Sequence, residues 1–346
     1  MRAAILRQGQ IVVDEVPEPV PGPGQILVET LACGICGSDL HCRLHAEDLV
    51  AASKASGMSI FDFDTKADLV MGHEFSARVL DLGPDVSDVS NIRPGDAIVC
   101  HPVILAAGRA QPVGYSNTYP GGFAERMVLE ASRALPVPNG LDPRLAALTE
   151  PMAVGLHAVN ASWVDQTKSA IVLGCGPVGL AVISALRLRG VPLVVAADFS
   201  PARRGFAAQL GAHVVVDPAD TEAVAAWRAA GGRGRTVVID AIGVPGIIES
   251  AMAAAPRRSQ ILVVGVCMQT DRFWPAVGIN KELTVTFVLG WNAEEFQECL
   301  AGIGEGRLDV APLVTGDVAL DGVAAAFDEL ARPDRHVKIL VRPNGV

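Results

Sequence analysis

The sequence predicts an α/β protein in which a small β barrel precedes a doubly wound parallel sheet. Residues 1–150 contain short strand-like runs separated by Gly and Pro, for example residues 25–30 and 95–100, which is typical of small barrels. From about residue 168, apolar strands alternate with helices, as in a parallel sheet covered on both faces. The length of 346 residues accommodates two domains of ordinary size.

The expected strands of the parallel sheet are short apolar runs at residues 170–173, 193–197, 236–239 and 260–264. The rest of the chain is expected to hold a helix over 293–303, a turn at Gly316, a helix over 320–330 and a strand over 336–341. We expect this tail to return to the first domain. The predicted domains are therefore residues 1–150, 151–292 and the returning segment 293–346.

Composition and charge favour a small-molecule partner. Charged residues make up 19% of the chain and the formal net charge is -10, so a broad basic face for nucleic acid or an anionic membrane is not expected. The apolar run at 191–197 is far shorter than the roughly 20 residues that span a bilayer. The N-terminal residues lack a secretory signal pattern, and the seven cysteines are scattered rather than clustered. We therefore expect a cytoplasmic protein with reduced thiols.

A glycine-rich turn joins the first parallel strand to the helix that follows it. It reads Gly174, Cys175, Gly176, Pro177, Val178, Gly179. The first glycine permits a tight turn, the second lets a pyrophosphate approach the backbone, and the third lets helix and strand pack closely. The N–H groups at the start of the helix then face the phosphate charge. Because the motif lies between a strand and a helix, we interpret it as a dinucleotide-binding turn rather than an ordinary glycine-rich loop.

Asp198 ends the next strand, at about the separation from the glycine turn where an acid reaches the adenosine ribose. Its charge repels a 2′-phosphate, so NAD is expected rather than NADP. Arg203 and Arg204 follow closely and would partly offset that repulsion.

Sulfur, imidazole and carboxylate groups are concentrated in two short stretches of the first domain. These groups belong to Cys33, Cys36, Asp39 and His41, and then to His73 and Glu74. Zinc binds Cys sulfur and His nitrogen readily, and a catalytic site needs three protein ligands and one open position. Cys36 and His73 are candidates for two of the three. The alternatives are a redox pair of Cys33 with Cys36 and a solvated surface pair of His73 with Glu74.

Taken together, these stretches resemble the zinc-dependent medium-chain alcohol and polyol dehydrogenases. The resemblance runs in order over nearly the whole chain. It includes the glycine turn and Glu150-Pro151. Three smaller marks agree with it, namely Gly95-Asp96, residues 121–125 and Lys338. It implies a GroES-like β-barrel catalytic domain, a Rossmann cofactor domain, and hydride transfer between an alcohol and NAD.

The resemblance also implies a metal site. Cys36 is similar to the first zinc ligand of the family, His73 to the second and Glu150 to the third. In some branches the residue that Glu74 resembles coordinates zinc while the counterpart of Glu150 acts through water, so the choice of carboxylate stays open. Asp39 is similar to the acid that orients the histidine ligand.

A proton path and a set of cofactor contacts follow from the same resemblance. Ser38 and His41 are similar to the hydroxyl and imidazole members of the family's proton relay. Glu74 is a further candidate for a catalytic group. The alternative for His41 is that its side chain caps a turn. The cofactor contacts implied are Gly174, Gly176, Pro177, Val178, Gly179, Asp198, Arg203, Gly265, Val266, Leu289 and Lys338. Gly265 and Val266 correspond to the backbone that holds the carboxamide, and Lys338 to a pyrophosphate contact.

The chain departs from the family in the region of the structural zinc. Many relatives hold this second ion with four closely spaced cysteines, whereas residues 100–109 contain Cys100 alone. Four thiolates are needed for such a site. We therefore predict one catalytic zinc per chain and no structural zinc.

An insertion over residues 42–70 is the second departure. It is expected to contain a helix over 46–58, followed by the aromatic residues Phe61 and Phe63. Since the motifs on both sides of it reach the metal, we expect the insertion to border the substrate site and to favour an apolar or ring-bearing alcohol. A surface ornament packed on the barrel is the alternative.

The sequence thus predicts an NAD- and zinc-dependent dehydrogenase of primary or secondary alcohols. By resemblance it forms a homodimer or homotetramer through the sheet edge at residues 283–286. One alternative is a zinc-free quinone or enone reductase of the same fold, which has no use for Cys36, His73 and Glu150 together. Another is a non-enzymatic dinucleotide-binding sensor, which would bind NADH without oxidising an alcohol.

Overall fold

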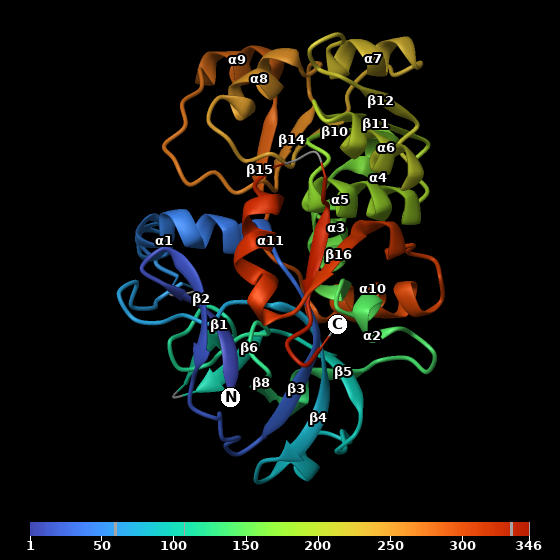
Figure 1. Ribbon diagram of the computed structural model, residues 1–346. Helices are drawn as coiled ribbons and strands as arrows, with labels where there is room; N and C mark the ends of the chain where they lie inside the picture. Colours follow the sequence, from blue (N-terminus) through green and yellow to red (C-terminus); the bar gives the residue numbers. More distant parts are fainter. Residues whose placement is uncertain (59–60, 107, 333–334, 346) are drawn as a thin grey trace. The chain divides into compact units, whose positions relative to one another are not determined.

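The computed structural model describes residues 1–58, 61–106, 108–332 and 335–345, which form two compact units (Figure 1). The first unit contains Met1–Glu150, Val314–Arg332 and the last strand of the chain. The second contains Pro151–Leu313 and the short stretch before that strand. The chain therefore leaves the first unit after Glu150 and returns to it from Val314 onward, apart from that short stretch.

The first unit is built on a 7-stranded sheet whose central strand is β3 (Gln25–Gly34). Along the sheet the order is β16-β17-β3-β4-β5-β9, and β8 pairs with β3 as well. The bounds of the other six strands are Glu74–Leu82 (β4), Ala97–Cys100 (β5), Arg126–Glu130 (β8), Ala134–Pro136 (β9), Val314–Val318 (β16) and Lys338–Val341 (β17). The inward-facing residues of β3 alternate with partly exposed ones, which is the pattern of a strand with one buried face.

Two hairpins and several helices complete the first unit. The hairpins are β1 (Arg2–Arg7) with β2 (Gln10–Glu15), and β6 (Val103–Ala106) with β7 (Arg109–Pro112). The helices are α1 (Gly37–Ala55), α2 (Pro143–Ala146), the start of α3 (Thr149–Asn160) and α11 (Val323–Leu330), with short 3-10 turns at Val86–Asp88, Ala131–Arg133 and Leu320–Gly322.

The second unit is built on a 6-stranded parallel sheet in the order β12-β11-β10-β13-β14-β15. Its strands are β10 (Ser169–Leu173), β11 (Leu193–Ala197), β12 (Val214–Val216), β13 (Val237–Asp240), β14 (Gln260–Val263) and β15 (Thr284–Phe287). The chain starts in the middle, runs to one edge and then returns to fill the other side. This order is the doubly wound Rossmann topology.

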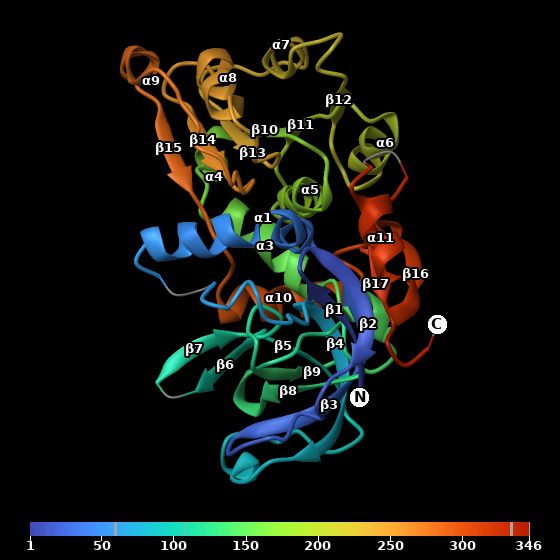
Figure 2. The same cartoon turned by 60° about the vertical axis from the view of Figure 1, so that its left-hand side comes forward.

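Helices cover both faces of this parallel sheet. They are α4 (Val164–Thr167), α5 (Pro177–Leu188), α6 (Pro201–Gln209), α7 (Ala223–Ala229), α8 (Ile247–Ala254), α9 (Pro275–Lys281) and α10 (Ala293–Gly304), with a 3-10 turn at Ala311–Leu313. Figure 2 shows α7 and α8 on one side of the strands and α5 on the other. Ile171, Val238 and Ile261 point to the first side and pack with Trp227 and Met252 in one buried cluster. Burial of both faces explains why the strands read as uninterrupted apolar runs.

The structure corrects the sequence analysis at four elements. Gly316 lies inside β16 rather than in a turn, because β16 pairs in parallel with β17 across a register shift between Val314 and Gly316. The short strand β12 was not expected. Helix α10 belongs to the second unit, where Glu295 accepts hydrogen bonds from α3, and not to the returning segment. The helix expected over 46–58 begins earlier, at Gly37, and is kinked at His45.

No helix in the described ranges combines the length and the apolar character needed to cross a membrane.

Candidate metal centre and cofactor site

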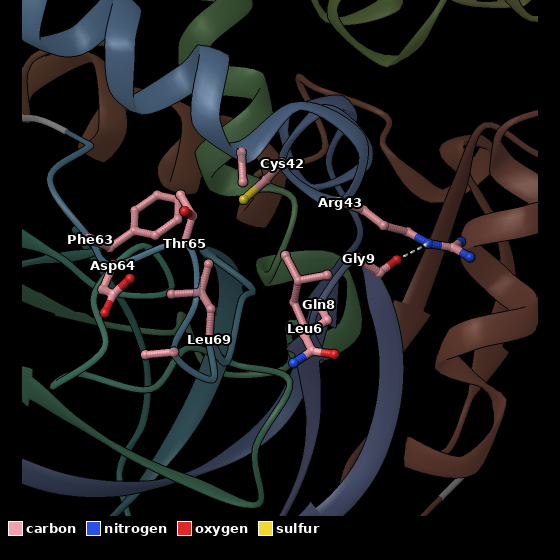
Figure 3. Close-up of a pocket in the computed structure, with 11 residues that line it drawn as sticks. Leu6, Gln8, Gly9, Cys42, Arg43, Phe63, Asp64, Thr65 and Leu69 are labelled. Atoms are coloured by element: carbon pink, nitrogen blue, oxygen red, sulfur yellow. Dashed lines mark hydrogen bonds between the residues drawn. The ribbon is translucent and has the colours of Figure 1, made fainter.

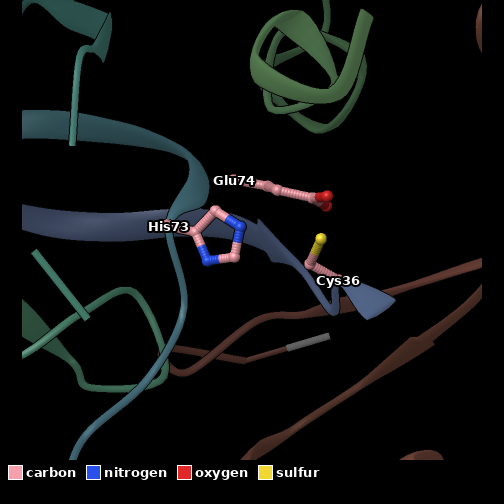
Figure 4. Close-up of side chains that lie close together, drawn as sticks. All are labelled: Cys36, His73 and Glu74. Atoms are coloured by element: carbon pink, nitrogen blue, oxygen red, sulfur yellow. The ribbon is translucent and has the colours of Figure 1, made fainter. Parts of the chain in front are cut away.

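The end of β3 and the start of β4 bring three candidate metal ligands together. The two strands are antiparallel, and Gly34 pairs directly with Glu74. Cys36 lies two residues beyond Gly34 at the N-cap of α1, and His73 precedes Glu74. The ligand atoms of Cys36, His73 and Glu74 all lie within 4.8 Å of one another (Figure 4). The pairing of these two strand ends thus brings the three side chains together.

Two glycines allow this close approach. A Cβ atom on Gly34 would collide with the carboxylate of Glu74 and lie 3.2 Å from Lys338 Cδ. Gly72 has φ +103, a left-handed conformation that favours glycine, and a Cβ there would lie 2.8 Å from Cys33 Sγ. Cys33 itself is fully buried, and burial raises the pKa of its thiol well above the ordinary value. Cys33 is therefore a packing residue, while Cys36 is the thiol that faces the other ligands.

Asp39 lies beside two of the candidate ligands. Its Oδ2 accepts a hydrogen bond of 2.9 Å from the backbone N–H of Cys36, which fixes the start of α1. Its Oδ1 lies 3.5 Å from Nδ1 of His73, a buried nitrogen that has no hydrogen-bond partner in the described ranges. Burial opposes protonation of His73, but the Asp39 carboxylate and Cys36 favour it, and the pKa of His73 lies above its ordinary value.

Lys338 forms a buried ion pair with Glu74. Its Nζ lies 2.7 and 2.6 Å from the two carboxylate oxygens and donates a further bond of 3.1 Å to the carbonyl of Ile35. Both side chains are at most 2% exposed. Burial opposes the ammonium form, but the charge of Glu74 outweighs it and raises the pKa of Lys338. The structure thus gives Lys338 a partner other than the pyrophosphate that the family resemblance implies.

Glu150 stands in the first turn of α3 and lies outside the cluster formed by Cys36, His73 and Glu74. Its charge still acts on the same centre, because it contributes to the raised pKa of Lys338. Of the two carboxylates left open by the sequence, the structure groups Glu74 with Cys36 and His73.

The donor set fits zinc. A thiol, an imidazole and a carboxylate are the side chains that zinc binds in catalytic sites. The buried Nδ1 of His73 faces the Asp39 carboxylate, which is the arrangement that leaves the other ring nitrogen for a metal. Cys36, His73 and Glu74 can therefore supply three ligands.

Ser38 and His41 both lie in the first turns of α1, close to Cys36 in sequence. Ser38 Oγ is 2.8 Å from the hydroxyl of Tyr115. Burial and the neighbouring His45 lower the pKa of His41. Among the described residues, no hydrogen bond joins Ser38 to His41, so a proton path through both would require a further group between them.

Tyr115 is a member of the centre that the sequence analysis missed. It is 5% exposed, and its hydroxyl lies 2.8 Å from Ser38 Oγ and 3.0 Å from Asp39 Oδ1. Its ring lies 5.3 Å from that of His73, centroid to centroid. The residue stands in the loop between β7 and β8, where no motif or periodicity marks it.

The insertion packs against Tyr115. Phe61 meets the Tyr115 ring edge-on at 4.9 Å between centroids, and Phe63 lies 6.5 Å from it. Phe63 also lines a small pocket with Leu6, Cys42 and other residues of β1, α1 and the insertion (Figure 3). None of the candidate metal ligands lines that pocket. Ser59 and Ile60, which belong to the insertion, lie outside the described residues.

In the second unit the glycine turn has the expected geometry. Gly174, between β10 and α5, has φ +89, and Gly176 is the N-cap of α5. A Cβ on Gly179 would collide with the carbonyl of Gly174. Pro177 occupies the first helical turn, where its missing N–H costs nothing. The backbone at the start of α5 is therefore free to approach an anion.

Asp198 and Arg203 flank the glycine turn. Asp198 follows β11, and its two carboxylate oxygens accept hydrogen bonds from the N–H groups of Cys175 (2.7 Å) and Ser200 (2.8 Å). Each oxygen keeps a lone pair for another donor. Arg203 Nε is buried and has no hydrogen-bond partner among the described residues. A carboxylate and a guanidinium group thus lie beside the turn.

The remaining predicted cofactor contacts lie at the carboxyl ends of β14 and β15. Gly265 follows β14 and packs closely on Gly243. A Cβ on Gly265 would lie 2.3 Å from the backbone N of Gly243, so only glycine fits at this position. Val266 is 50% exposed and Leu289 is 66% exposed. Ligands of doubly wound sheets bind at this edge.

Comparisons with known proteins agree with this architecture. The alcohol dehydrogenase GroES-like domain matches residues 22–139, and the zinc-binding dehydrogenase domain matches residues 177–304. The chain is 32% identical to the (R,R)-butanediol dehydrogenase of Bacillus subtilis, over 97% of this chain and 98% of the relative.

Solved structures give the same result. The crystal structure of 2R,3R-butanediol dehydrogenase from Bacillus subtilis is similar with a TM-score of 0.85 at 31% identity, covering 99% of both chains. A zinc-binding dehydrogenase from Sinorhizobium meliloti, bound to NADP, has a TM-score of 0.83 at 27% identity, again over 99% of both chains. This chain therefore belongs to the zinc-dependent medium-chain dehydrogenases. Within that family it is an oxidoreductase of the alcohol and polyol dehydrogenase type.

Proposed function

We propose that the protein is an NAD-dependent alcohol dehydrogenase with one catalytic zinc, which interconverts a primary or secondary alcohol and its carbonyl. The observation that carries the proposal is the cluster of Cys36, His73 and Glu74, whose ligand atoms lie within 4.8 Å of one another. The glycine turn at Gly174 supports the cofactor half of the reaction. A zinc-free reductase or a sensor of the same fold would have no use for the cluster.

The chemistry divides between the cofactor and the residues of the first unit. A zinc ion held by Cys36, His73 and a carboxylate would supply Lewis-acid chemistry, which lowers the pKa of a coordinated hydroxyl. The alcohol loses its hydroxyl proton and a hydride from carbon, the hydride passes to the nicotinamide, and a carbonyl and NADH result. Ser38, two residues after Cys36, is the proposed first acceptor of the proton, and His41 a later one. Asp39 holds His73 in place.

The proposal is tested by following NADH formation by absorbance while alcohols are supplied to the purified protein. We expect alcohol-dependent reduction of NAD that stops when a chelator removes the metal. Binding of NADH without any alcohol-dependent signal across primary, secondary and diol substrates would instead support the sensor.

We propose that each chain holds one zinc. Cys100 is buried and its thiol contacts the carbonyls of His101 and Glu130, and hairpin β6–β7 contains no further thiol. Atomic absorption on the purified protein should give one zinc per chain. Two per chain would contradict the account of this hairpin.

We propose NAD as the preferred cofactor, supported by the position of Asp198 beside the glycine turn. Asp198→Asn keeps one acceptor oxygen but removes the charge. It should therefore lower the ratio of kcat/KM with NAD to kcat/KM with NADP by about tenfold, which corresponds to about 1.4 kcal/mol. The comparison of kcat/KM with the two cofactors measures this. Asp220→Asn, at an exposed acid after β12, is the control. Equal preferences in the wild type would count against the proposal.

The proposed substrate is an apolar or ring-bearing alcohol, supported by the contact of Phe61 with Tyr115 beside His73. The butanediol dehydrogenase relative makes a small vicinal diol the second candidate. A panel of cyclic, aromatic and small polyol substrates decides between them through kcat/KM. Higher values for small polyols would reject the apolar alcohol.

We further propose a homodimer or homotetramer, supported by the position of β15 at the edge of the parallel sheet and by exposed Phe287 and Leu289. Seven free cysteines support a reducing compartment, the cytoplasm.

A further inference from the structure

The hydroxyl of Tyr115 lies between two groups of the metal centre that have different hydrogen-bonding abilities. It is 2.8 Å from Ser38 Oγ and 3.0 Å from Asp39 Oδ1. A phenol carries one hydrogen, a carboxylate only accepts, and a serine hydroxyl can donate or accept. Both contacts have the geometry of donation by Tyr115, so one hydroxyl serves two acceptors.

Ser38 Oγ accepts a hydrogen bond from the Tyr115 hydroxyl. In the described part of the chain, Tyr115 is the one hydrogen-bond partner of Ser38 Oγ. The hydrogen of the Ser38 hydroxyl is therefore not used by this contact. A group that relays the proton of an alcohol needs such a hydrogen to pass on.

The same hydroxyl fixes Asp39. Asp39 is fully buried, and its oxygens are divided between Cys36, Tyr115 and His73. Oδ2 accepts from the Cys36 backbone, while Oδ1 lies 3.0 Å from the Tyr115 hydroxyl and 3.5 Å from His73 Nδ1. Loss of the Tyr115 hydroxyl would leave Oδ1 without its hydrogen-bond donor and free to rotate away from His73.

Packing holds the Tyr115 ring in one place. His73 lies on one part of the ring, and Phe61 and Phe63 contact it from the insertion. These contacts involve the ring and not the hydroxyl. Substitution by Phe should therefore keep the packing and remove the hydrogen bonds alone.

We propose that Tyr115 is a positioning residue of the metal centre, which holds the Asp39 carboxylate against His73 and keeps Ser38 Oγ in place. The proposal rests on the proposed function, since it assigns Ser38 to the proton path. It adds a group that acts on the metal ligand and on the proton acceptor at once.

The test compares Tyr115→Phe with Tyr119→Phe, the other tyrosine of the chain, whose described hydrogen bonds are made by its backbone. The first readout is the rate of zinc transfer from the protein to a chromogenic chelator. The second is the separation of kcat from KM for an alcohol at saturating NAD. Removal of a group that orients a metal ligand costs about 10- to 100-fold in metal affinity or activity.

We expect Tyr115→Phe to release zinc about tenfold faster and to lower kcat about tenfold, with KM changed less than about twofold and Tyr119→Phe equal to wild type. Combining Tyr115→Phe with Ser38→Ala should lower kcat no further than Ser38→Ala alone, while zinc release stays fast. Wild-type zinc release and kcat in Tyr115→Phe would overturn the proposal, and so would a lowered melting temperature as its only effect. A wild type that oxidises no alcohol would overturn the proposed function, yet the zinc-release comparison would still decide whether Tyr115 holds Asp39.

Discussion

Replacement of Cys36 by Ser should lower kcat/KM for alcohol oxidation by about 1000-fold or more. A serine hydroxyl is a poor ligand for zinc, and the Lewis-acid contribution that is lost amounts to several kcal/mol, with each 1.36 kcal/mol corresponding to a tenfold change in rate. Zinc content should fall in parallel. The variant should still bind NADH, because the glycine turn lies in the other unit of the chain.

Cys42→Ala is the matched control for that variant. Cys42 is a buried thiol of the same helix, but it lines the small pocket beneath α1 and is not part of the ligand cluster. It should keep both zinc and activity. Retention of full activity by Cys36→Ser would contradict the proposed mechanism and favour the zinc-free reductase.

Replacement of Lys338 by Met should have the largest effect on stability. In the metal-free protein it leaves the Glu74 carboxylate buried without its counter-ion, and removal of one partner from a buried pair costs about 3–5 kcal/mol. Adding Glu74→Gln in the same chain should recover most of the loss, because the uncompensated charge disappears. Denaturant unfolding followed by far-UV circular dichroism measures the change.

The chain provides two controls for this experiment. All four tryptophans, at positions 163, 227, 274 and 291, lie in the second unit, so their fluorescence should report an unfolding transition that Lys338→Met leaves nearly unchanged. Lys54 pairs with Asp62 at the surface over 3.8 Å, with both side chains about half exposed or more. Lys54→Met should therefore cost less than about 1 kcal/mol. A similarly small loss of unfolding free energy in Lys338→Met would show that burial of the Glu74 carboxylate does not depend on Lys338.

The fold could be predicted from the sequence where burial has a simple pattern. The parallel strands at residues 169–173 and 193–197 are buried on both sides and read as uninterrupted apolar runs. The three-residue strand β12 and the irregular strand β16 were missed for the opposite reason. Neither has a fully buried residue, and β16 contains a glycine at its register shift, which in a sequence indicates a turn.

The candidate site was predicted only in part, for physical reasons. Cys36, His73 and Glu74 could be proposed from the sequence because their chemistry is local to short motifs. The pairing of Lys338 with Glu74 joins residues 264 positions apart and depends on β17 lying next to β3, which no local pattern indicates. Tyr115 was missed because its role arises from one hydroxyl placed by a loop.

The central claim is that one zinc ion, held at Cys36, His73 and a carboxylate, is required for alcohol oxidation. The most direct measurement is a titration of chelator-treated protein with zinc, in which NADH formation from an alcohol is recorded at each addition. The account predicts no activity without metal, followed by a linear rise that ends at one zinc per chain. Full activity of the metal-free protein, or a rise that continues to two zinc ions per chain, would contradict it.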